Sequence, residues 1–272
     1  MTDHATRFVF SRDGPLEAAI ERGAALGFTR VDFNADKPEN FPGTFTPARV
    51  SDIRALARHH GVRIGLHTLS AVNMAEITPV MHAAIDEYVR ENLDLAVSVG
   101  AGYVICHGGY HFGADREARM AIAIARMQRA ATLAEQRGLT ICFENHNKEP
   151  DDAEIHYMPR DVVETRRFFE AVTSHRFRWA FNVGHAHLVP DGFDGFFDAF
   201  GVDRIAQVRL NDTHGRYEEH LVPGKGMVDF RHVFRRLATA GYAGPYSLDF
   251  GTAEEKAHWR DVFAGYLLEF SR

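Results

Sequence analysis

The chain has 272 residues, with 31 Lys and Arg against 37 Asp and Glu, and its formal net charge is −6 at pH 7. This acidic balance, without a cluster of Lys and Arg, argues against a protein that binds nucleic acid or an anionic membrane surface. Hydrophobic residues make up 45% of the chain, which is enough for a full core, and no run approaches the roughly 20 apolar residues of a membrane-spanning helix. The N-terminus lacks the apolar segment of a signal peptide, so we expect a cytoplasmic protein in which Cys106 and Cys142 are buried, reduced thiols.

Short runs rich in Val, Ile, Leu and Phe alternate with amphipathic segments along the chain. The runs predict strands at residues 7–11, 30–34, 63–68, 103–107, 140–145, 178–183, 206–211 and 245–250. The segments between and after them predict helices at residues 15–26, 48–60, 80–99, 116–137, 159–172, 193–200, 230–240 and 254–270. Pro15 and Pro159 are typical of helix starts, and Gly138 is typical of a helix end.

This alternation predicts an α/β fold built from parallel βαβ units. Eight units without a linker indicate a single (β/α)8 TIM barrel that occupies residues 1–272 as one domain. An open, doubly wound sheet is the alternative. It would more often carry a glycine-rich phosphate turn after its first strand, where this chain reads SRDGPLE.

Polar residues stand at the ends of six successive predicted strands, 27 to 40 residues apart. They are His67, His107, Glu144, Asn182, Arg209 and Asp249. In a (β/α)8 barrel the C-terminal ends of the strands meet at one face, where the active sites of such enzymes lie. We therefore expect these side chains to share one site.

Two groups of residues have the chemistry of metal ligands. His67, His107 and Glu144 end neighbouring strands, which lie about 4.8 Å apart in a sheet. Two imidazoles and a carboxylate suit Zn, Mn or Fe, although each residue could also be an ordinary buried polar group. A second candidate group lies just past the sixth strand and in the loop after the seventh: His185, Glu218 and His220. We expect a divalent metal cofactor of open identity.

Glu144 and Asp249 form the candidate catalytic pair. Two carboxylates can take a proton from one face of a substrate and return it elsewhere, but each could equally form only a salt bridge. Arg209 could clamp a substrate carboxylate or phosphate, or it could neutralise one of these two residues. The Gly224–Gly226 turn resembles a phosphate-binding turn, although such tripeptides are usually only flexible.

Over roughly residues 63 to 250, the chain resembles the xylose-isomerase-like barrel superfamily. The matching pieces are LHTLSA, ICHGG, FENHN, FNVGHAHL, VRLNDTHG, EEHLVPGKGMVDF and YSLDF. The superfamily includes sugar and sugar-phosphate isomerases and epimerases, hydroxypyruvate isomerase, inosose dehydratase and an AP-endonuclease branch. In the epimerase branch one metal is held by Glu, Asp, His and Glu, at positions that match Glu144, Asn182, Arg209 and Asp249. Because Arg cannot bind a cation, the chain departs from that pattern at its centre.

In the AP-endonuclease branch three zinc ions are used. The ligands of the two outer ions match His67, His107 and Glu144 for one, and His185, Glu218 and His220 for the other, with Glu218 where Asp is usual. The middle ion would use the altered positions, and the resemblance suggests that the charge of Arg209 replaces it. The resemblance to the epimerases also implies substrate contacts from His185 and Arg216.

Together these observations predict a metal-assisted isomerase or epimerase of a small sugar-like or hydroxy-ketone substrate, with a role in carbohydrate metabolism. Proton transfer would pass through an enediolate, with substrate contacts from His185, Arg209, Asn182 and Arg216. The alternatives are a lyase or dehydratase on the same barrel, an AP-endonuclease-like phosphodiester hydrolase, and a non-catalytic sugar-binding barrel. We expect a small-molecule partner and neither nucleic acid nor membrane, and the sequence leaves open a homodimer.

Overall fold

Eight parallel strands close into a barrel. The computed structural model describes residues 4–12, 14–68 and 72–271. The barrel strands are β1 (Phe8–Arg12), β2 (Arg30–Asn34), β3 (Arg63–His67), β4 (Tyr103–Cys106), β6 (Thr140–Glu144), β8 (Phe177–Asn182), β9 (Ile205–Leu210) and β10 (Tyr246–Leu248). They follow one another around the barrel in chain order, and β10 pairs with β1 to close it. The predicted (β/α)8 barrel is confirmed.

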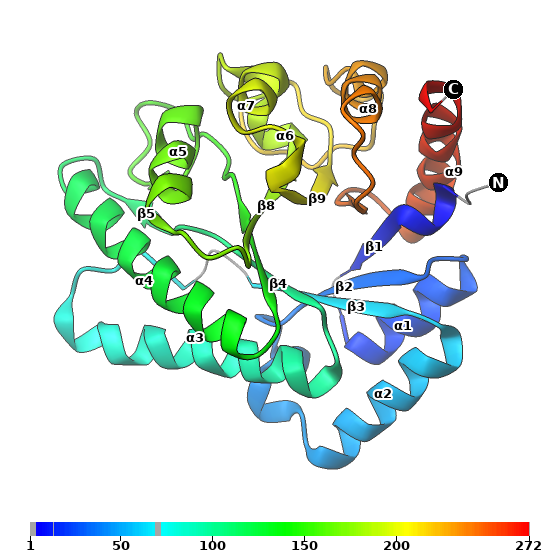
Figure 1. Ribbon diagram of the computed structural model, residues 1–272, viewed down its shortest axis with the longest axis horizontal. Coiled ribbons are helices and arrows are strands. Elements are labelled where there is room, and N and C mark those ends of the chain that lie inside the picture. The colour runs from blue at the N-terminus through cyan, green and yellow to red at the C-terminus, as the bar shows by residue number, and fades with distance from the viewer. Residues whose placement is uncertain (1–3, 13, 69–71, 272) are drawn as a thin grey trace.

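Helices surround the barrel (Figure 1). They are α1 (Leu16–Ala25), α2 (Pro47–His60), α3 (Pro79–Val99), α4 (Arg116–Gln136), α5 (Val162–Ala171), α6 (Val183–Ala186), α7 (Gly192–Phe200), α8 (Phe230–Thr239) and α9 (Ala253–Phe270). Short 3-10 helices lie at His4–Arg7, Pro38–Asn40, Pro42–Thr44 and Val202–Arg204. Since helices cover the outer face of the strands and side chains fill the inner face, the strands read as nearly continuous apolar runs.

Two local features differ from the sequence prediction. Helix α5 begins at Val162 rather than Pro159 because Asp161 caps it, with its side chain accepting a hydrogen bond from the Glu164 N–H at 2.8 Å. The loops after β4 and β6 also pair with each other, as an antiparallel sheet of β5 (Tyr110–His111) and β7 (His156–Tyr157). Strands of two residues carry no periodic signal, so the sequence does not reveal them.

Aromatic side chains fill the space between the barrel and its helices. Phe143 of β6 is fully buried, and its ring centroid lies 4.6 Å from that of Phe168 on α5 and 5.0 Å from that of Phe177 on β8. Trp179 of β8 stacks on Phe181 at 3.9 Å. Buried rings of this kind remove on the order of 150–250 Å² each from water. They hold strands and helices in a fixed register, and this register fixes the strand ends.

Both cysteines pack as apolar residues. Cys106 and Cys142 are free and buried, as expected, and burial raises the pKa of the Cys106 thiol to about 12. In the part of the chain that the structure describes, no helix combines the length and the apolar character that crossing a bilayer requires.

Helix α9 depends on a capping box at its start. The Thr252 hydroxyl accepts a hydrogen bond from the Glu255 N–H at 3.2 Å, and the Glu255 carboxylate accepts one from the Thr252 N–H at 2.8 Å. Thr252→Ala should therefore lower the free energy of unfolding by about 1 kcal/mol, measured by urea denaturation. Thr132→Ala is the matched control, because Thr132 is exposed inside α4, where Ala favours the helix. Equal losses in both variants would contradict the capping role.

Candidate functional site

The C-terminal ends of the strands surround a cavity of about 420 Å³. Eight of the predicted site residues line it: His67, His107, Glu144, His185, Arg209, Glu218, His220 and Asp249. They meet there because parallel strands of a barrel end at the same rim. The structure thus brings together side chains that are far apart in the sequence.

Two other predicted site residues lie outside the cavity lining. Asn182 is fully buried, and its Nδ2 donates to Glu144 Oε1 at 2.8 Å, while its Oδ1 accepts from the His185 N–H at 3.0 Å and from Asn211 Nδ2 at 3.1 Å. The Asn182 amide therefore orients Glu144. Arg216 is exposed in the loop after β9. A substrate contact from either residue stays a prediction.

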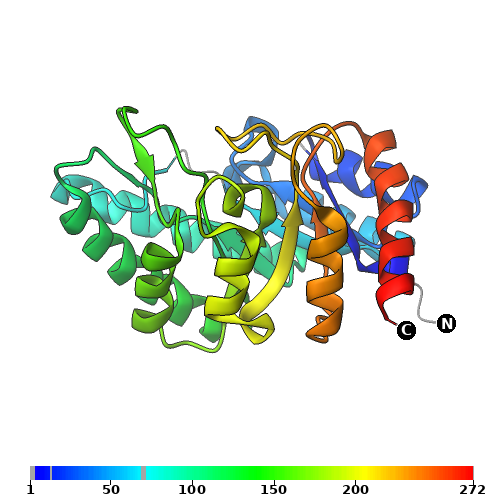
Figure 2. The same cartoon turned by 90° about the horizontal axis from the view of Figure 1, so that it is seen from above.

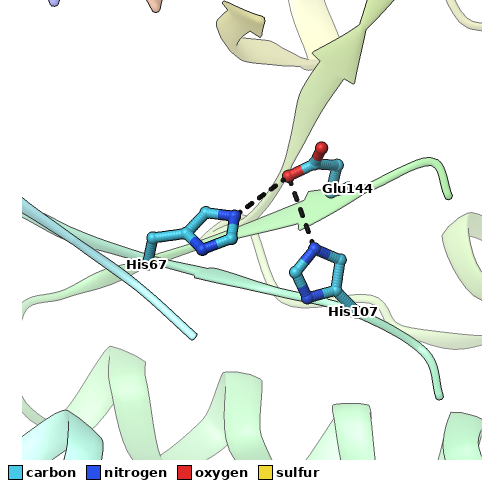
Figure 3. Close-up of side chains that lie close together, drawn as sticks. All are labelled: His67, His107 and Glu144. Carbon is cyan, nitrogen blue, oxygen red and sulfur yellow. Dashed lines mark ion pairs between the residues drawn. The ribbon is translucent and has the colours of Figure 1, made fainter. Parts of the chain in front are cut away.

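His67, His107 and Glu144 form a compact group at the ends of β3, β4 and β6 (Figure 3). The Nε2 atoms of His67 and His107 lie 3.5 and 3.6 Å from Glu144 Oε2. This Oε2 is buried and accepts no hydrogen bond from the residues that the structure describes. A buried carboxylate oxygen without a hydrogen bond, facing two imidazole nitrogens, is a position suited to a proton or a cation.

Arg209 of β9 contacts both candidate catalytic carboxylates. Its Nη2 donates to Asp249 Oδ2 at 2.7 Å, and its Nε lies 3.1 Å from Glu144 Oε2. The Nε–H and this oxygen are poorly aligned, so Nε too is buried without a hydrogen-bond partner among the described residues. Of the roles that the sequence left open for Arg209, neutralising the carboxylates is the one seen here. The Nε–H of the guanidinium therefore remains available to a ligand.

The Arg209 charge keeps both carboxylates ionised despite their burial. Burial raises the pKa of Glu144, but Arg209 and the two neighbouring imidazoles outweigh it and hold this pKa well below its usual value. Burial also raises the pKa of Asp249, and Arg209 and His220 reverse the effect, so that the pKa is about 2. At neutral pH both groups are therefore proton acceptors.

His185, Glu218 and His220 form the second group. Glu218 Oε1 lies 2.9 Å from His185 Nε2 and 2.6 Å from His220 Nε2. The opposite ring nitrogens bond to backbone carbonyls, His185 Nδ1 to Asn145 O at 2.9 Å and His220 Nδ1 to Asp249 O at 2.8 Å. Because a carbonyl can only accept, each Nδ1 carries a proton and each Nε2 faces the carboxylate. Metal-binding histidines are commonly held in this way.

Asp212 holds the loop that carries Glu218 and His220, which Figure 2 shows in yellow to orange at the upper edge of the view. The Asp212 carboxylate accepts hydrogen bonds of 2.8 to 3.0 Å from the backbone N–H groups of Gly224, Gly226 and Val228. The sequence left open a phosphate-binding role for this turn. In the structure the N–H groups of Gly224 and Gly226 instead donate to a carboxylate of the chain itself.

Sequence reasoning missed His146 and Tyr157, which also line the cavity. The His146 ring stacks on Tyr157 with centroids 4.2 Å apart and planes 8° apart, and its centroid lies 4.8 Å from that of His107 and 5.7 Å from that of His185. His146 therefore lies beside one histidine of each group. A signal existed, because His146 is two positions beyond Glu144 and alternate residues of a strand share a face. No pattern marked Tyr157, which β7 brings to the rim.

Both His/Glu groups fit a divalent ion, whereas the central positions of the superfamily pattern do not. Each group offers two imidazole nitrogens and a carboxylate oxygen that all lie within 4.8 Å of one another. By contrast, Asn182 turns its N–H₂ donor toward Glu144, and nearby carboxylates raise the pKa of Arg209 even though burial lowers it. The chain thus carries a fixed positive charge where the epimerase pattern has a metal ligand.

Comparison with known proteins gives a consistent set of relatives. The family described as xylose isomerase-like TIM barrel matches residues 20–265. The chain is 21% identical to fructoselysine 3-epimerase of Escherichia coli O157:H7 over 238 residues, which cover 85% of this chain and 83% of that protein. It is 24% identical to a probable endonuclease 4 of Symbiobacterium thermophilum over 269 residues, 92% of this chain and 95% of that protein. A solved D-tagatose 3-epimerase-like protein is similar in fold, with a TM-score of 0.83 and 19% identity over 97% of this chain and 98% of that one.

Glu218 and Asp249 together raise the pKa of His220. Burial lowers the pKa of His220, but the charges of Asp249 and Glu218 outweigh it and raise the pKa to about 9. Glu218→Gln should therefore lower this pKa, measured by NMR titration of the ring protons in metal-free protein. Glu219→Gln is the matched control, because it removes the same charge one position away, where the carboxylate contacts His214. Equal shifts in the two variants would refute the assignment.

The contact between Glu218 and His220 also makes the free energy of unfolding depend on pH. The folded-state pKa of His220 lies above the unfolded value of about 6.5, so its stabilising contribution is complete below that pH and is lost as the pH rises through about 9. In Glu218→Gln this loss should begin at lower pH.

Proposed function

The chain belongs to the xylose isomerase-like TIM barrel family, and we propose that it is a sugar epimerase or isomerase. The substrate is a small sugar-like ketose or hydroxy-ketone, and the reaction moves a proton at the carbon beside its carbonyl. Two findings support this proposal: the similarity to fructoselysine 3-epimerase, and a cavity whose lining includes two carboxylates that Arg209 keeps ionised.

One observation carries the proposal. Glu144 Oε2 and Arg209 Nε lie 3.1 Å apart, and neither makes a hydrogen bond to the described residues. A substrate oxygen that accepts a hydrogen bond from the Arg209 Nε–H would therefore place its neighbouring C–H group beside Glu144. Buried polar groups usually have partners, so an unsatisfied acceptor beside an unsatisfied donor is a site prepared for a polar ligand.

In the proposed reaction Glu144 takes the proton from the carbon beside the carbonyl, and the electron pair moves to oxygen to give an enediolate. Arg209 stabilises this oxygen because its charge is permanent and already in position. Asp249 bonds to the far end of the same guanidinium. In an epimerase it relays a proton from a substrate hydroxyl or water to the opposite face of the carbon, and the proton on Glu144 then returns to that oxygen, which restores both carboxylates. When no ion occupies the second group, His185 Nε2 holds a further substrate hydroxyl.

His67, His107 and Glu144 would hold one divalent ion, and His185, Glu218 and His220 another, and Zn, Mn or Fe bound there would act as a Lewis acid on substrate oxygens. Glu144 has one oxygen for either role, because Asn182 occupies Oε1 and only Oε2 faces the two imidazoles. Oε2 cannot bind a cation and accept a proton at the same time. An ion in the first group would therefore exclude Glu144 as the base, whereas an ion in the second group alone leaves Glu144 free to act.

Other functions have weaker support. A lyase or dehydratase would begin with the same proton abstraction and differ only in releasing water. Phosphodiester hydrolysis by two metals needs ions about 4 Å apart, and Arg209, which cannot bind a cation, stands where the superfamily pattern has a ligand of the central ion. A sugar-binding barrel without catalysis would not need two ionised carboxylates on one guanidinium.

Glu144→Gln tests the proposed base. The amide cannot accept the proton, so turnover should fall by about 10²- to 10⁴-fold. The measurement is deuterium incorporation beside the carbonyl of D-tagatose or D-fructose in D₂O, followed by mass spectrometry and NMR. Glu154→Gln, an exposed residue after the same strand, is the matched control and should keep full activity. Full activity of Glu144→Gln would reject the mechanism, and a product lighter by one water would identify a lyase.

Metal content tests the two His/Glu groups. Elemental mass spectrometry of wild type, His107→Ala and His220→Ala should find bound Zn, Mn or Fe, with one ion lost when the ligand of its own group is removed. An ion lost only in His107→Ala belongs to the first group, and an ion lost only in His220→Ala belongs to the second. If wild type binds no ion, even when metal is added, the metal assignment fails and Arg209 alone acts as the electrophile.

A further inference from the structure

We infer that a polar layer inside the barrel holds Arg209 in place, and that Asp32, Tyr103 and Gln207 are positioning residues for the site. The inference rests on the proposed function for its kinetic consequence. The hydrogen bonds of the layer themselves indicate how the Arg209 guanidinium is held in position.

The three residues form a closed set of hydrogen bonds. The Tyr103 hydroxyl donates to Asp32 Oδ1, and Gln207 Nε2 donates to Asp32 Oδ2 at 3.1 Å and to the Tyr103 hydroxyl oxygen at 2.9 Å. Asp32 lies on β2, Tyr103 on β4 and Gln207 on β9, and β1 and β10 separate β2 from β9 around the barrel. The contacts between Asp32 and Gln207 therefore cross the interior of the barrel.

This layer ends on the guanidinium. Gln207 Oε1 accepts from Arg209 Nη1 at 3.3 Å, and Asp32 Oδ2 lies 3.8 Å from the same nitrogen. Since the Gln207 amide nitrogen is used by Asp32 and Tyr103, its oxygen must face Arg209. Nη1 is thus held by the interior and Nη2 by Asp249, so the orientation of the planar fork is set and Nε lies beside Glu144.

A glycine provides the space for this arrangement. Gly65 lies on β3, between the strands that carry Asp32 and Tyr103. A Cβ atom at Gly65 would lie 2.3 Å from Asp32 Oδ1 and 2.3 Å from Tyr103 Cζ. The contact between the two residues therefore occupies the volume that a side chain of β3 would fill.

A buried polar layer often stabilises a barrel less than apolar side chains would, which argues that this layer has a functional role. Interior layers of such barrels are usually filled by bulky apolar side chains. Replacing a buried charged network by apolar residues is often neutral or stabilising for a protein. A fully hydrogen-bonded polar layer that ends on Arg209 instead holds the N–H donor of the site in one position before substrate arrives, as electrostatic catalysis requires.

A double-mutant cycle tests whether the layer acts through Arg209. Asp32→Asn should lower kcat about tenfold and change KM by less than twofold, because a misplaced guanidinium stabilises the transition state poorly. In an Arg209→Lys background, which keeps the charge and loses the planar fork, Asp32→Asn should add no further loss. Additive losses would show that Asp32 affects the fold in general and would overturn the inference.

Ser247→Ala is the matched control. Ser247 lies on β10 and is fully buried, and its hydroxyl has no hydrogen-bond partner among the described residues. Its substitution should leave kcat unchanged. Tyr103→Phe removes one oxygen and keeps the ring, so it provides the same test, with a smaller loss, if Asp32→Asn does not fold.

An NMR measurement tests the inference without any substrate. The Nε–H signal of Arg209, assigned by its absence in Arg209→Lys, should exchange slowly with water in wild type. In Tyr103→Phe and Gly65→Ala it should exchange at least about tenfold faster, and in Ser247→Ala it should not change. Equal exchange in all of them would refute the positioning role. If no sugar is converted but exchange accelerates as expected, the proposed function fails and the positioning role stands.

Discussion

A single buried guanidinium governs the chemistry of this rim. Glu144 and Arg209 are each only 2% exposed, and several kcal/mol oppose the burial of either charge alone. Their opposite charges compensate each other, and the Asp249 carboxylate contacts Arg209 from a further side. Removing one partner of such a buried set costs about 3–5 kcal/mol, because the remaining charge is left without compensation. Without Arg209, only neighbouring histidines would oppose the rise in the pKa of Glu144 and Asp249 that burial causes, so Arg209 has a structural as well as a chemical role.

The sequence predicted the fold and the location of the site because both depend on local patterns. Apolar runs with polar ends identify strands, and the geometry of a parallel barrel then gathers those ends. The pairing of Arg209 with two carboxylates was one of several open possibilities, since the choice depends on distances across the rim. Asp32 and Gln207 gave no signal at all. Each stands among apolar residues of a strand that is buried on both faces, where inward and outward positions cannot be told apart by hydropathy.

The two His/Glu groups differ in what fixes them. His67, His107 and Glu144 project from neighbouring strands, whose register is set by backbone ladders and by the aromatic layer behind them. Glu218 and His220 instead lie in a loop, and only His185 follows directly from a strand. His220 has a backbone φ of 50°, a left-handed conformation that is uncommon for residues other than glycine. The strands of the barrel therefore set the positions of the first group, whereas the positions of the second group depend on the conformation of one loop.

The hydrogen bonds to the Asp212 carboxylate fix one end of this loop separately from its tip. Hydrogen bonds from Gly224, Gly226 and Val228 fix its returning end, while residues 214, 216 and 217 are exposed. The hydrogen bonds to Asp212 do not involve these exposed residues, so substitutions there would change the mouth of the cavity while the returning end stays in place. The sequence at the loop tip can therefore vary while the returning end of the loop keeps its conformation. The surface of the cavity mouth and the framework that supports it are thus built from separate parts of one loop.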